Sequence, residues 1–308
     1  MSPSNDRSGP KTNDSSLELI KEEIAIMKKL SHNNLVSLYE VLDDPDEDSL
    51  YMVLEMCKKG VVMKVGLDER AEPYKEEACR CWFRDMILGI EYLHAQGVVH
   101  RDIKPDNCLI TNDDVLKIVD FGVSEMFEKA SDMATAKSAG SPAFMPPELC
   151  VAKHGQVSGR AADIWSMGVT LFCLRYGHIP FEQHGMLELY ESIRGDDVNL
   201  DNEHDQQFAD LMHRLLEKNP EKRITMPQLR VSENDSRTRC CDRQLTILPG
   251  TSLGDSERQR PLVACRGELL RSGRASHSEG DESCDHKQHG QPSGGDEGSQ
   301  TLQASAWS

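Results

Sequence analysis

Residues 100–107 have the sequence His-Arg-Asp-Ile-Lys-Pro-Asp-Asn, and residues 120–122 have the sequence Asp-Phe-Gly. The second motif begins thirteen residues after Asn107. A lone Asp-Phe-Gly is ordinary turn chemistry, but two motifs in this order and at this spacing are hard to attribute to chance. We therefore interpret the rest of the chain outward from these two stretches.

The side chains of the two motifs suit phosphoryl transfer. That reaction needs a carboxylate that orients an attacking hydroxyl, a cation near the transferred phosphate, and oxygen ligands for magnesium. Asp102 is the candidate base and Lys104 the candidate cation. Asn107 and Asp120 carry the hard oxygen atoms that Mg²⁺ prefers, so we expect both to be metal ligands.

Composition excludes several classes of protein. The 308 residues include 35 lysines and arginines against 52 aspartates and glutamates, a formal net charge of −17, which argues against a nonspecific nucleic-acid binder. No run approaches the roughly 20 apolar residues of a membrane span, so no membrane partner is expected. The ten cysteines lack the paired spacing of metal sites, and we interpret them as reduced thiols of a cytoplasmic protein.

Composition also divides the chain into three parts. Residues 1–16 are predicted to be a disordered lead-in, residues 17–230 a partial catalytic domain, and residues 231–308 a disordered tail. The only aromatic residue of the tail is Trp307, so the tail has too little apolar bulk to offset the entropy of ordering. A marginal helix within residues 262–270, its most apolar stretch, stays open.

Hydrophobic periodicity predicts the main elements of the middle part. The predicted helices are one that follows Ser15 and extends to Leu30, and those over residues 76–94, 161–176 and 206–216; the predicted strands are residues 35–39, 50–54, 108–110 and 116–119.

These motifs resemble the catalytic and magnesium-binding loops of eukaryotic protein kinases. The resemblance continues through Pro146-Pro147-Glu148, where the family usually has Ala-Pro-Glu. Residues 163–168 are similar to the signature of the family's central buried helix, and Arg223 matches the arginine that pairs with the glutamate at position 148. The resemblance implies an α+β, protein-kinase-like fold with a helical large lobe that looks complete and a truncated small lobe.

A narrower resemblance points to one kinase family. Residues 41–45, 140–145 and 218–220 are similar to calcium/calmodulin-dependent protein kinase kinases, and to a fungal member in particular. Lys104 is similar to the lysine of serine/threonine kinases. The resemblance implies ATP and Mg²⁺ as cofactors and transfer of the γ-phosphate to protein Ser/Thr, on activation loops of downstream kinases. Calmodulin is a partner in that family, but no basic amphipathic helix that could bind it is predicted in the tail.

The resemblance also implies roles on the nucleotide side. Glu23 would be the helix-C glutamate, which in kinases pairs with the strand-3 lysine that holds ATP. Leu54 would be the gatekeeper, Glu55 and Cys57 would present backbone groups to adenine, and Leu109 would form the floor beneath it. From pattern alone, Glu23 is equally a solvated helix residue, and Leu54, Cys57 and Leu109 are ordinary core residues.

The activation segment would be residues 124–141. Ser141 stands where many kinases use a threonine to contact Asp102 and Lys104. Thr135 and Ser138 are candidate phosphorylation sites within the segment, although any serine or threonine in a polar loop would qualify.

Two family features are missing from the sequence. It contains no Gly-x-Gly-x-x-Gly loop and no Val-Ala-Ile-Lys strand, so strands 1–3 of the small lobe are expected to be absent. Three interpretations stay open: an active kinase, a catalytically impaired fragment that acts as a binding module, and a chain from an incomplete gene model. In the last case, Ile20, Ile24 and Met27 of the first helix would be partly uncovered.

Overall fold

A computed structural model describes residues 13–44, 49–128, 133–135, 140–201, 203–233 and 263–266. Among these residues the α-helices are α1 (Asn13–Met27), α2 (Glu76–Ala95), α3 (Gly159–Tyr176), α4 (Met186–Gly195), α5 (Gln206–Leu215) and α6 (Met226–Glu233). The short 3₁₀ helices are η1 (Pro105–Asn107), η3 (Pro142–Phe144) and η4 (Pro147–Leu149). The strands are β1 (Leu38–Asp44), β2 (Ser49–Leu54), β3 (Gly60–Val61), β4 (Val98–Val99), β5 (Cys108–Ile110), β6 (Leu116–Ile118), β7 (Glu125–Met126), β8 (Ala134–Thr135), β9 (Val157–Ser158) and β10 (Val263–Arg266).

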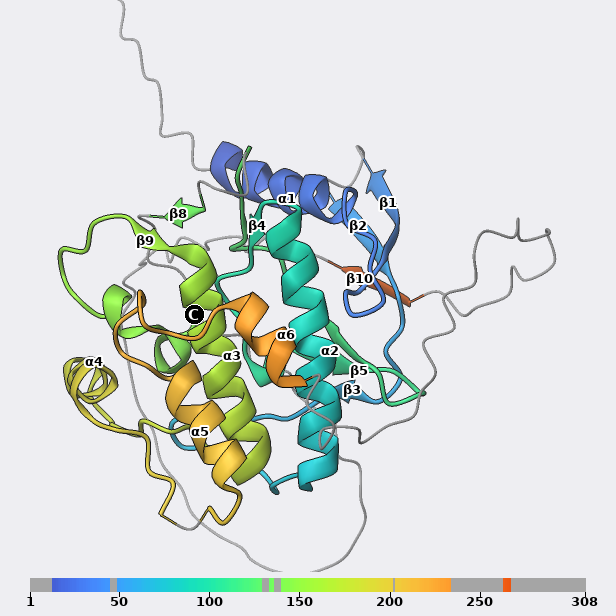
Figure 1. Cartoon of the computed structure of the whole chain (residues 1–308). Helices are drawn as coiled ribbons and strands as arrows, with labels where there is room; N and C mark the ends of the chain where they lie inside the picture. The colour runs from blue at the N-terminus through green and yellow to red at the C-terminus, as the bar shows by residue number, and fades with distance from the viewer. Residues whose placement is uncertain are drawn as a thin grey trace, which may run out of the picture. The chain divides into compact units, whose positions relative to one another are not determined.

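Helices α2 and α3 form the centre of the core, and they pack against each other (Figure 1). Helix α3 is buried on every side, and Trp165 and Met167 at its middle are fully buried, as expected for a helix enclosed by others. The Ser158 hydroxyl accepts a hydrogen bond from the Ala161 amide at its start, and Gly177 ends it with a φ of 75°. Both helices confirm the sequence prediction to within two residues.

Strands β1 and β2 form an antiparallel sheet that lies with α1 at one end of the helical core (Figure 1). Strand β1 starts three residues later than predicted and runs to Asp44. The reason is tertiary: residues 34–36 pair with β6 instead, since the Val36 amide donates to the Ile118 carbonyl and the Ile118 amide donates to the Asn34 carbonyl, both at 2.9 Å.

Strand β10 corrects the prediction for the tail, where we expected either no regular structure or a marginal helix. Residues 263–266 pair antiparallel with β2, with Val263 opposite Leu54 and Arg266 opposite Tyr51. The edge of β2 that does not face β1 has backbone groups that can pair with an extended segment. The composition of residues 263–266 does not reveal that they will pair with this edge. The other tail residues after 233 lie outside the described residues.

The first helix also differs from its prediction. It begins at Asn13, inside the stretch predicted to be disordered, while residues 1–12 lie outside the described part of the chain. Ile24 and Met27 are buried, with 8% and 4% of their surfaces exposed, and Ile20 is half-buried. The expectation that these side chains are uncovered is therefore wrong for Ile24 and Met27.

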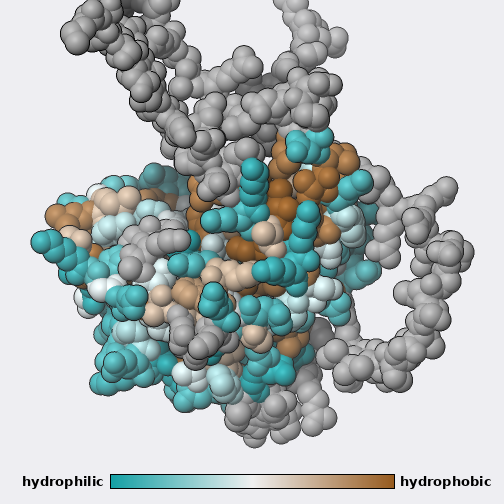
Figure 2. Space-filling model, turned by 90° about the horizontal axis from the view of Figure 1, so that it is seen from above, coloured by the Kyte–Doolittle hydropathy of each residue, from teal (hydrophilic) through white to brown (hydrophobic). Residues whose placement is uncertain are grey.

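The surface of this end carries apolar side chains among polar ones (Figure 2). Leu19 of α1 and Leu42 of β1 are 57% and 46% exposed. Among the described residues no helix is both long enough and apolar enough to cross a bilayer.

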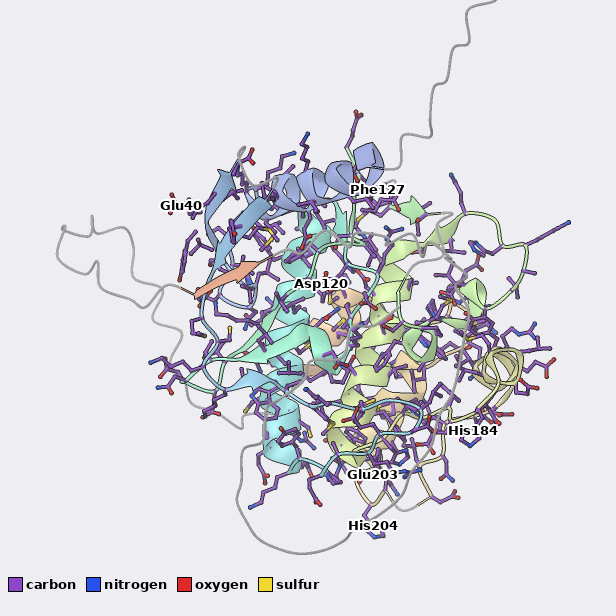
Figure 3. The ribbon with its side chains drawn as sticks, turned by 180° about the vertical axis from the view of Figure 1, so that it is seen from behind. Glu40, Asp120, Phe127, His184, Glu203 and His204 are labelled. Carbon is purple, nitrogen blue, oxygen red and sulfur yellow. The ribbon has the colours of Figure 1, made fainter. Side chains whose placement is uncertain are left out.

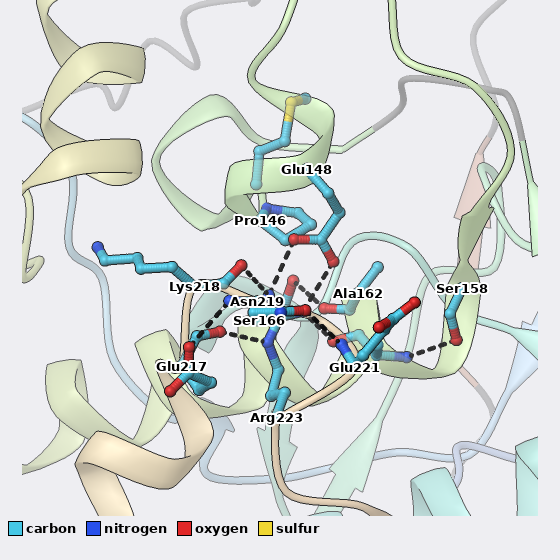
Figure 4. A network of polar contacts seen from close by, with 12 residues as sticks. Pro146, Glu148, Ser158, Ala162, Ser166, Glu217, Lys218, Asn219, Glu221 and Arg223 are labelled. Atoms are coloured by element: carbon cyan, nitrogen blue, oxygen red, sulfur yellow. Dashed lines mark hydrogen bonds and ion pairs between the residues drawn. The ribbon is translucent and has the colours of Figure 1, made fainter.

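A buried ion pair fastens the segment after residue 140 to the helical core (Figure 4). Both terminal nitrogens of Arg223 bond the Glu148 carboxylate, each at 2.8 Å. Arg223 also donates to the Ala161 carbonyl at 2.7 Å and to the Glu217 carbonyl at 2.9 Å. The predicted pairing of Arg223 with Glu148 is confirmed.

Lys218 gives the fold a testable pH dependence. Its Nζ donates to the Ile193 carbonyl at 2.7 Å and lies 4.3 Å from the centre of the Phe181 ring. Burial lowers the pKa of Lys218 to about 8, whereas an unfolded lysine has a pKa of about 10.4. Between these values the unfolded chain binds more protons, so the free energy of unfolding contributed by this group rises with pH from about 8 to about 10.

We therefore expect the stability difference between wild type and Lys218→Met to shift in favour of wild type between pH 7.5 and pH 9.5. Urea unfolding of both proteins at the two pH values measures the shift, and effects common to both chains cancel. Lys222→Met, which changes an exposed lysine nearby, should show no such shift. An equal pH response of the Lys218 and Lys222 variants would contradict the prediction.

Candidate active site

A buried carboxylate of α3 anchors the loop over residues 100–107. Asp163 of α3 is fully buried and accepts hydrogen bonds from the His100 amide at 3.0 Å and the Arg101 amide at 2.9 Å. The His94 ring lies 2.8 Å from the same carboxylate. These bonds fix a loop in which Arg101 adopts a φ of 69°, a conformation that non-glycine residues seldom take.

Asp102 lies at the centre of the loop's polar contacts. Its Oδ1 accepts from the Ser141 amide at 2.8 Å and from the Ser141 hydroxyl at 2.9 Å, and its Oδ2 lies 2.9 Å from Lys104 Nζ. Lys104 Nζ also donates to the Ser141 hydroxyl at 2.8 Å. The structure thus brings together three of the residues that the sequence singled out.

The protonation state of Asp102 follows from these contacts. Burial alone raises the pKa of this carboxyl, but hydrogen bonds from Lys104 and Ser141 and the charge of Lys104 outweigh it. The pKa of Asp102 therefore lies below its usual value, and the side chain is a carboxylate at neutral pH. A carboxylate in this state can accept a proton.

Asn107 is oriented by Asp102. Its Nδ2 donates to the Asp102 carbonyl at 2.8 Å and to Asp102 Oδ2 at 3.0 Å. Because the nitrogen is used in this way, the amide oxygen of Asn107 is the atom left to bind a cation.

Asp120 is exposed and lies between α1 and the helical core (Figure 3). Its φ is 69°, and its Oδ1 accepts from the Gly122 amide at 3.1 Å. Glu23 of α1 is its neighbour: burial first, and then the negative charge of Asp120, raise the pKa of Glu23. Two carboxyl groups this close concentrate negative charge at the start of the Asp-Phe-Gly turn.

The donor set fits a magnesium ion. Mg²⁺ usually takes one or two carboxylates and completes its shell with waters and phosphate oxygens. Asp120 and Asn107 supply oxygen donors of this kind, and the negative charge shared by Glu23 and Asp120 favours a divalent cation there. Within the described residues no group of three or more His, Cys, Asp or Glu side chains forms a closed metal cage.

The sequence of the chain matches the protein kinase domain over residues 6–233. The chain belongs to the protein kinase family. The kinase match starts before residue 17, the predicted domain boundary, and ends three residues beyond the predicted end at residue 230.

Similar kinases come from fungi and animals. The chain is 73% identical over 186 residues to the calcium/calmodulin-dependent protein kinase kinase cmkC of Emericella nidulans, covering 60% of this chain and 36% of the relative. It is 41% identical over 218 residues to the Caenorhabditis elegans calcium/calmodulin-dependent protein kinase kinase, covering 70% of this chain and 40% of the relative. It is 41% identical over 223 residues to the serine/threonine-protein kinase ssp1 of Schizosaccharomyces pombe, covering 70% of this chain and 34% of the relative. The chain is thus a member of the protein kinase family that is similar to the calcium/calmodulin-dependent protein kinase kinases, and the match spans 34–40% of these relatives' lengths.

The residues predicted on the nucleotide side of the kinase domain cluster around the segment after β2. Leu54 ends β2, and Glu55 and Cys57 follow it. Leu109 is on β5 and is paired with Val61 of β3, the strand that follows this segment. Cys57 is buried, and burial raises the pKa of its thiol to about 11, so its side chain is a neutral apolar group. These positions fit the predicted roles, which stay predictions.

Glu23 of α1 is a neighbour of Asp120. Within the described residues it forms no ion pair with a lysine or arginine. The described part of the chain also contains no strand before α1. The pairing that the resemblance implies for Glu23 is therefore not found among these residues.

The two candidate phosphorylation sites differ. Ser138 lies outside the described residues. Thr135 is 2% exposed, and its hydroxyl donates to Glu125 Oε2 at 2.7 Å. In this conformation of the kinase, Thr135 is closed to a modifying enzyme.

Three functional positions were missed by the sequence analysis. Asp163 was quoted as part of a helix signature, but its hold on the catalytic loop was not predicted; an aspartate inside an otherwise apolar helix was the available signal. Glu125 lies 3.4 Å from Arg101 Nη1 and Lys117 lies 2.9 Å from Glu55 Oε2. No sequence pattern marked either of these pairs.

Proposed function

We propose that this chain is a serine/threonine protein kinase that transfers the γ-phosphate of ATP to protein hydroxyl groups. The contact that carries the proposal is the one between Asp102 and Lys104, 2.9 Å apart and both bonded to Ser141. This contact places a carboxylate base beside a cation in a loop that Asp163 anchors.

The proposed reaction is a direct transfer. The hydroxyl oxygen of the substrate attacks the γ-phosphorus, the bond between that phosphorus and the β,γ-bridging oxygen breaks, and ADP leaves. Asp102 orients the hydroxyl and takes its proton, and Lys104 stabilises the charge that develops on the phosphoryl oxygens. Magnesium, held by Asn107 and Asp120, would neutralise the phosphates.

The substrate class is the finer part of the proposal. We infer protein substrates, and among them the activation loops of other kinases, because similar proteins are named kinase kinases. Their names also connect them with calmodulin, for which this sequence offers no predicted binding helix. The cytoplasmic location inferred from the cysteines stays a prediction.

A second candidate is a catalytically impaired binding module. It is favoured by Glu23, which has no cationic partner among the described residues, and by the absence of a glycine-rich loop from the sequence. Without these parts the ATP phosphates lose much of their positioning, which can contribute several kcal/mol to catalysis.

Magnesium-dependent transfer to a kinase activation-loop substrate distinguishes the two candidates. In Asp120→Asn, we expect the rate to fall about 10²–10³-fold, because the metal ligand loses its charge. Asparagine tolerates the positive φ of this position, so the fold should survive. Wild-type transfer that the variant loses supports the kinase, whereas absence of transfer by the folded wild type refutes it and leaves the binding module.

A further inference from the structure

An ion pair between a buried lysine and a largely buried glutamate joins two parts of the proposed nucleotide site. Lys117 of β6 is 8% exposed, and its Nζ lies 2.9 Å from Glu55 Oε2. The same nitrogen donates to the Leu35 carbonyl at 3.3 Å, and Glu55 Oε2 also accepts from the Ser37 amide at 3.3 Å. The pair is therefore held from both sides by the segment between α1 and β1.

This connecting segment, residues 31–37, is fixed to the large helical part of the domain. The Asn34 side chain donates to the Leu116 carbonyl at 3.0 Å, and residues 34 and 36 form backbone bonds with Ile118. At its start, the Ser31 amide donates to the Tyr92 hydroxyl of α2 at 3.0 Å. The segment therefore cannot move relative to β6 without breaking several hydrogen bonds.

The pair acts on the peptide that is proposed to meet adenine. Glu55 is fixed twice, by its carboxylate on Lys117 and by its amide, which donates to the Ser37 carbonyl at 2.9 Å. With amide and side chain both held, the Cα of Glu55 and the bond from it to the carbonyl carbon are fixed in place. Among the described residues, neither that carbonyl nor the Cys57 amide has a hydrogen-bond partner, and these are the two groups proposed to meet adenine.

The other member of the pair, Lys117, lies close in the sequence to Asp120, the proposed metal ligand. Lys117 precedes Asp120 by three residues, and Val119 between them is anchored because its amide donates to the Asn107 carbonyl at 3.0 Å. One ion pair thus connects the segment that faces adenine with the strand that positions the metal-binding carboxylate. Removing one member of a buried pair leaves the other charge without compensation, so it must move toward water.

We propose that Lys117 and Glu55 are positioning residues for the nucleotide, and that their ion pair holds the adenine-facing peptide in register with Asp120. This inference rests on the proposed function, because it takes the ligand to be ADP or ATP with magnesium. It concerns binding, so it can be tested without phosphoryl transfer.

The test is the affinity of the full 308-residue chain for ADP with magnesium, measured by calorimetry. We expect Lys117→Met and Glu55→Gln each to weaken binding at least about tenfold, which corresponds to about 1.4 kcal/mol. The double variant should bind ADP no more weakly than the single variant of lower affinity. The two substitutions remove the same ion pair, so their losses of binding free energy should not add. Lys59→Met is the matched control: it removes an exposed pair with Asp114, 2.6 Å long and 45% and 54% exposed, and should leave the affinity within about twofold.

Thermal unfolding separates positioning from general damage. If Lys117→Met does not fold, Glu55→Gln decides, because it keeps the size of the side chain and removes only its charge. Unchanged or tighter ADP binding in a folded single variant would overturn the proposal, as would additive losses in the double variant. A wild type that binds ADP but transfers no phosphate refutes the proposed function alone, whereas a folded wild type that binds no ADP refutes both.

Discussion

Replacement of Asp102 with asparagine is expected to lower kcat for phosphoryl transfer roughly 10²–10⁴-fold, the usual contribution of a positioned general base. Asparagine has the same shape and can still accept the hydrogen bonds from Ser141, so the loop should keep its conformation. What it loses is the negative charge opposite Lys104, the oxygen that accepts from Asn107 Nδ2, and the ability to accept a proton. Steady-state kinetics with a protein substrate measure the effect.

Asp106→Asn is the matched control, since it makes the same chemical change in the same loop. Asp106 belongs to η1 and forms none of the contacts with Lys104 Nζ or Ser141 that define the Asp102 site. Its kcat should fall far less than that of Asp102→Asn. Comparable losses in the two variants, or unchanged turnover in Asp102→Asn, would show that Asp102 is not the base.

Replacement of Arg223 with methionine is expected to lower the free energy of unfolding by about 3–5 kcal/mol, because it leaves a buried carboxylate unpaired. The Arg223 side chain is fully buried, and Glu148 is 10% exposed. The substitution also removes the donors that bond the Ala161 and Glu217 carbonyls. A loss of this size is a large part of a typical domain's total stability. Urea unfolding monitored by circular dichroism measures it.

Two further variants sharpen this prediction. Arg214→Met removes an exposed pair with Asp210, 3.7 Å long, and should cost less than about 1 kcal/mol. Removing both charges, in Arg223→Met with Glu148→Gln, should restore part of the loss because no buried charge is left alone. A loss below 1 kcal/mol in Arg223→Met would mean that the ion pair does not hold this part of the domain together.

The local pattern was sufficient for elements whose residues carry their own signal. Helix α2 was predicted because its apolar residues recur at helical spacing, and β5 because it is a short apolar run after a turn. The start of β1 was predicted wrongly because Leu35 and Val36 are as suitable for a strand as Leu38 and Tyr39. Their pairing with Ile118, more than 80 positions away, decided which of them continued the sheet.

The sequence by itself determined the kinase family and the residues of the catalytic loop. Motif order and spacing were enough for this, because phosphoryl transfer needs a base, a cation and oxygen ligands for magnesium, and Asp102, Lys104, Asn107 and Asp120 are candidates for these roles. Only the tertiary structure decided that Ser141 bridges Asp102 and Lys104, that Asp163 supports the loop, and that Lys117 pairs with Glu55. These contacts join residues between 37 and 63 positions apart. Buried charged groups need hydrogen bonds or ion pairs to offset the cost of leaving water. Which groups are buried depends on the packing of the folded chain, so no local sequence pattern contains this information.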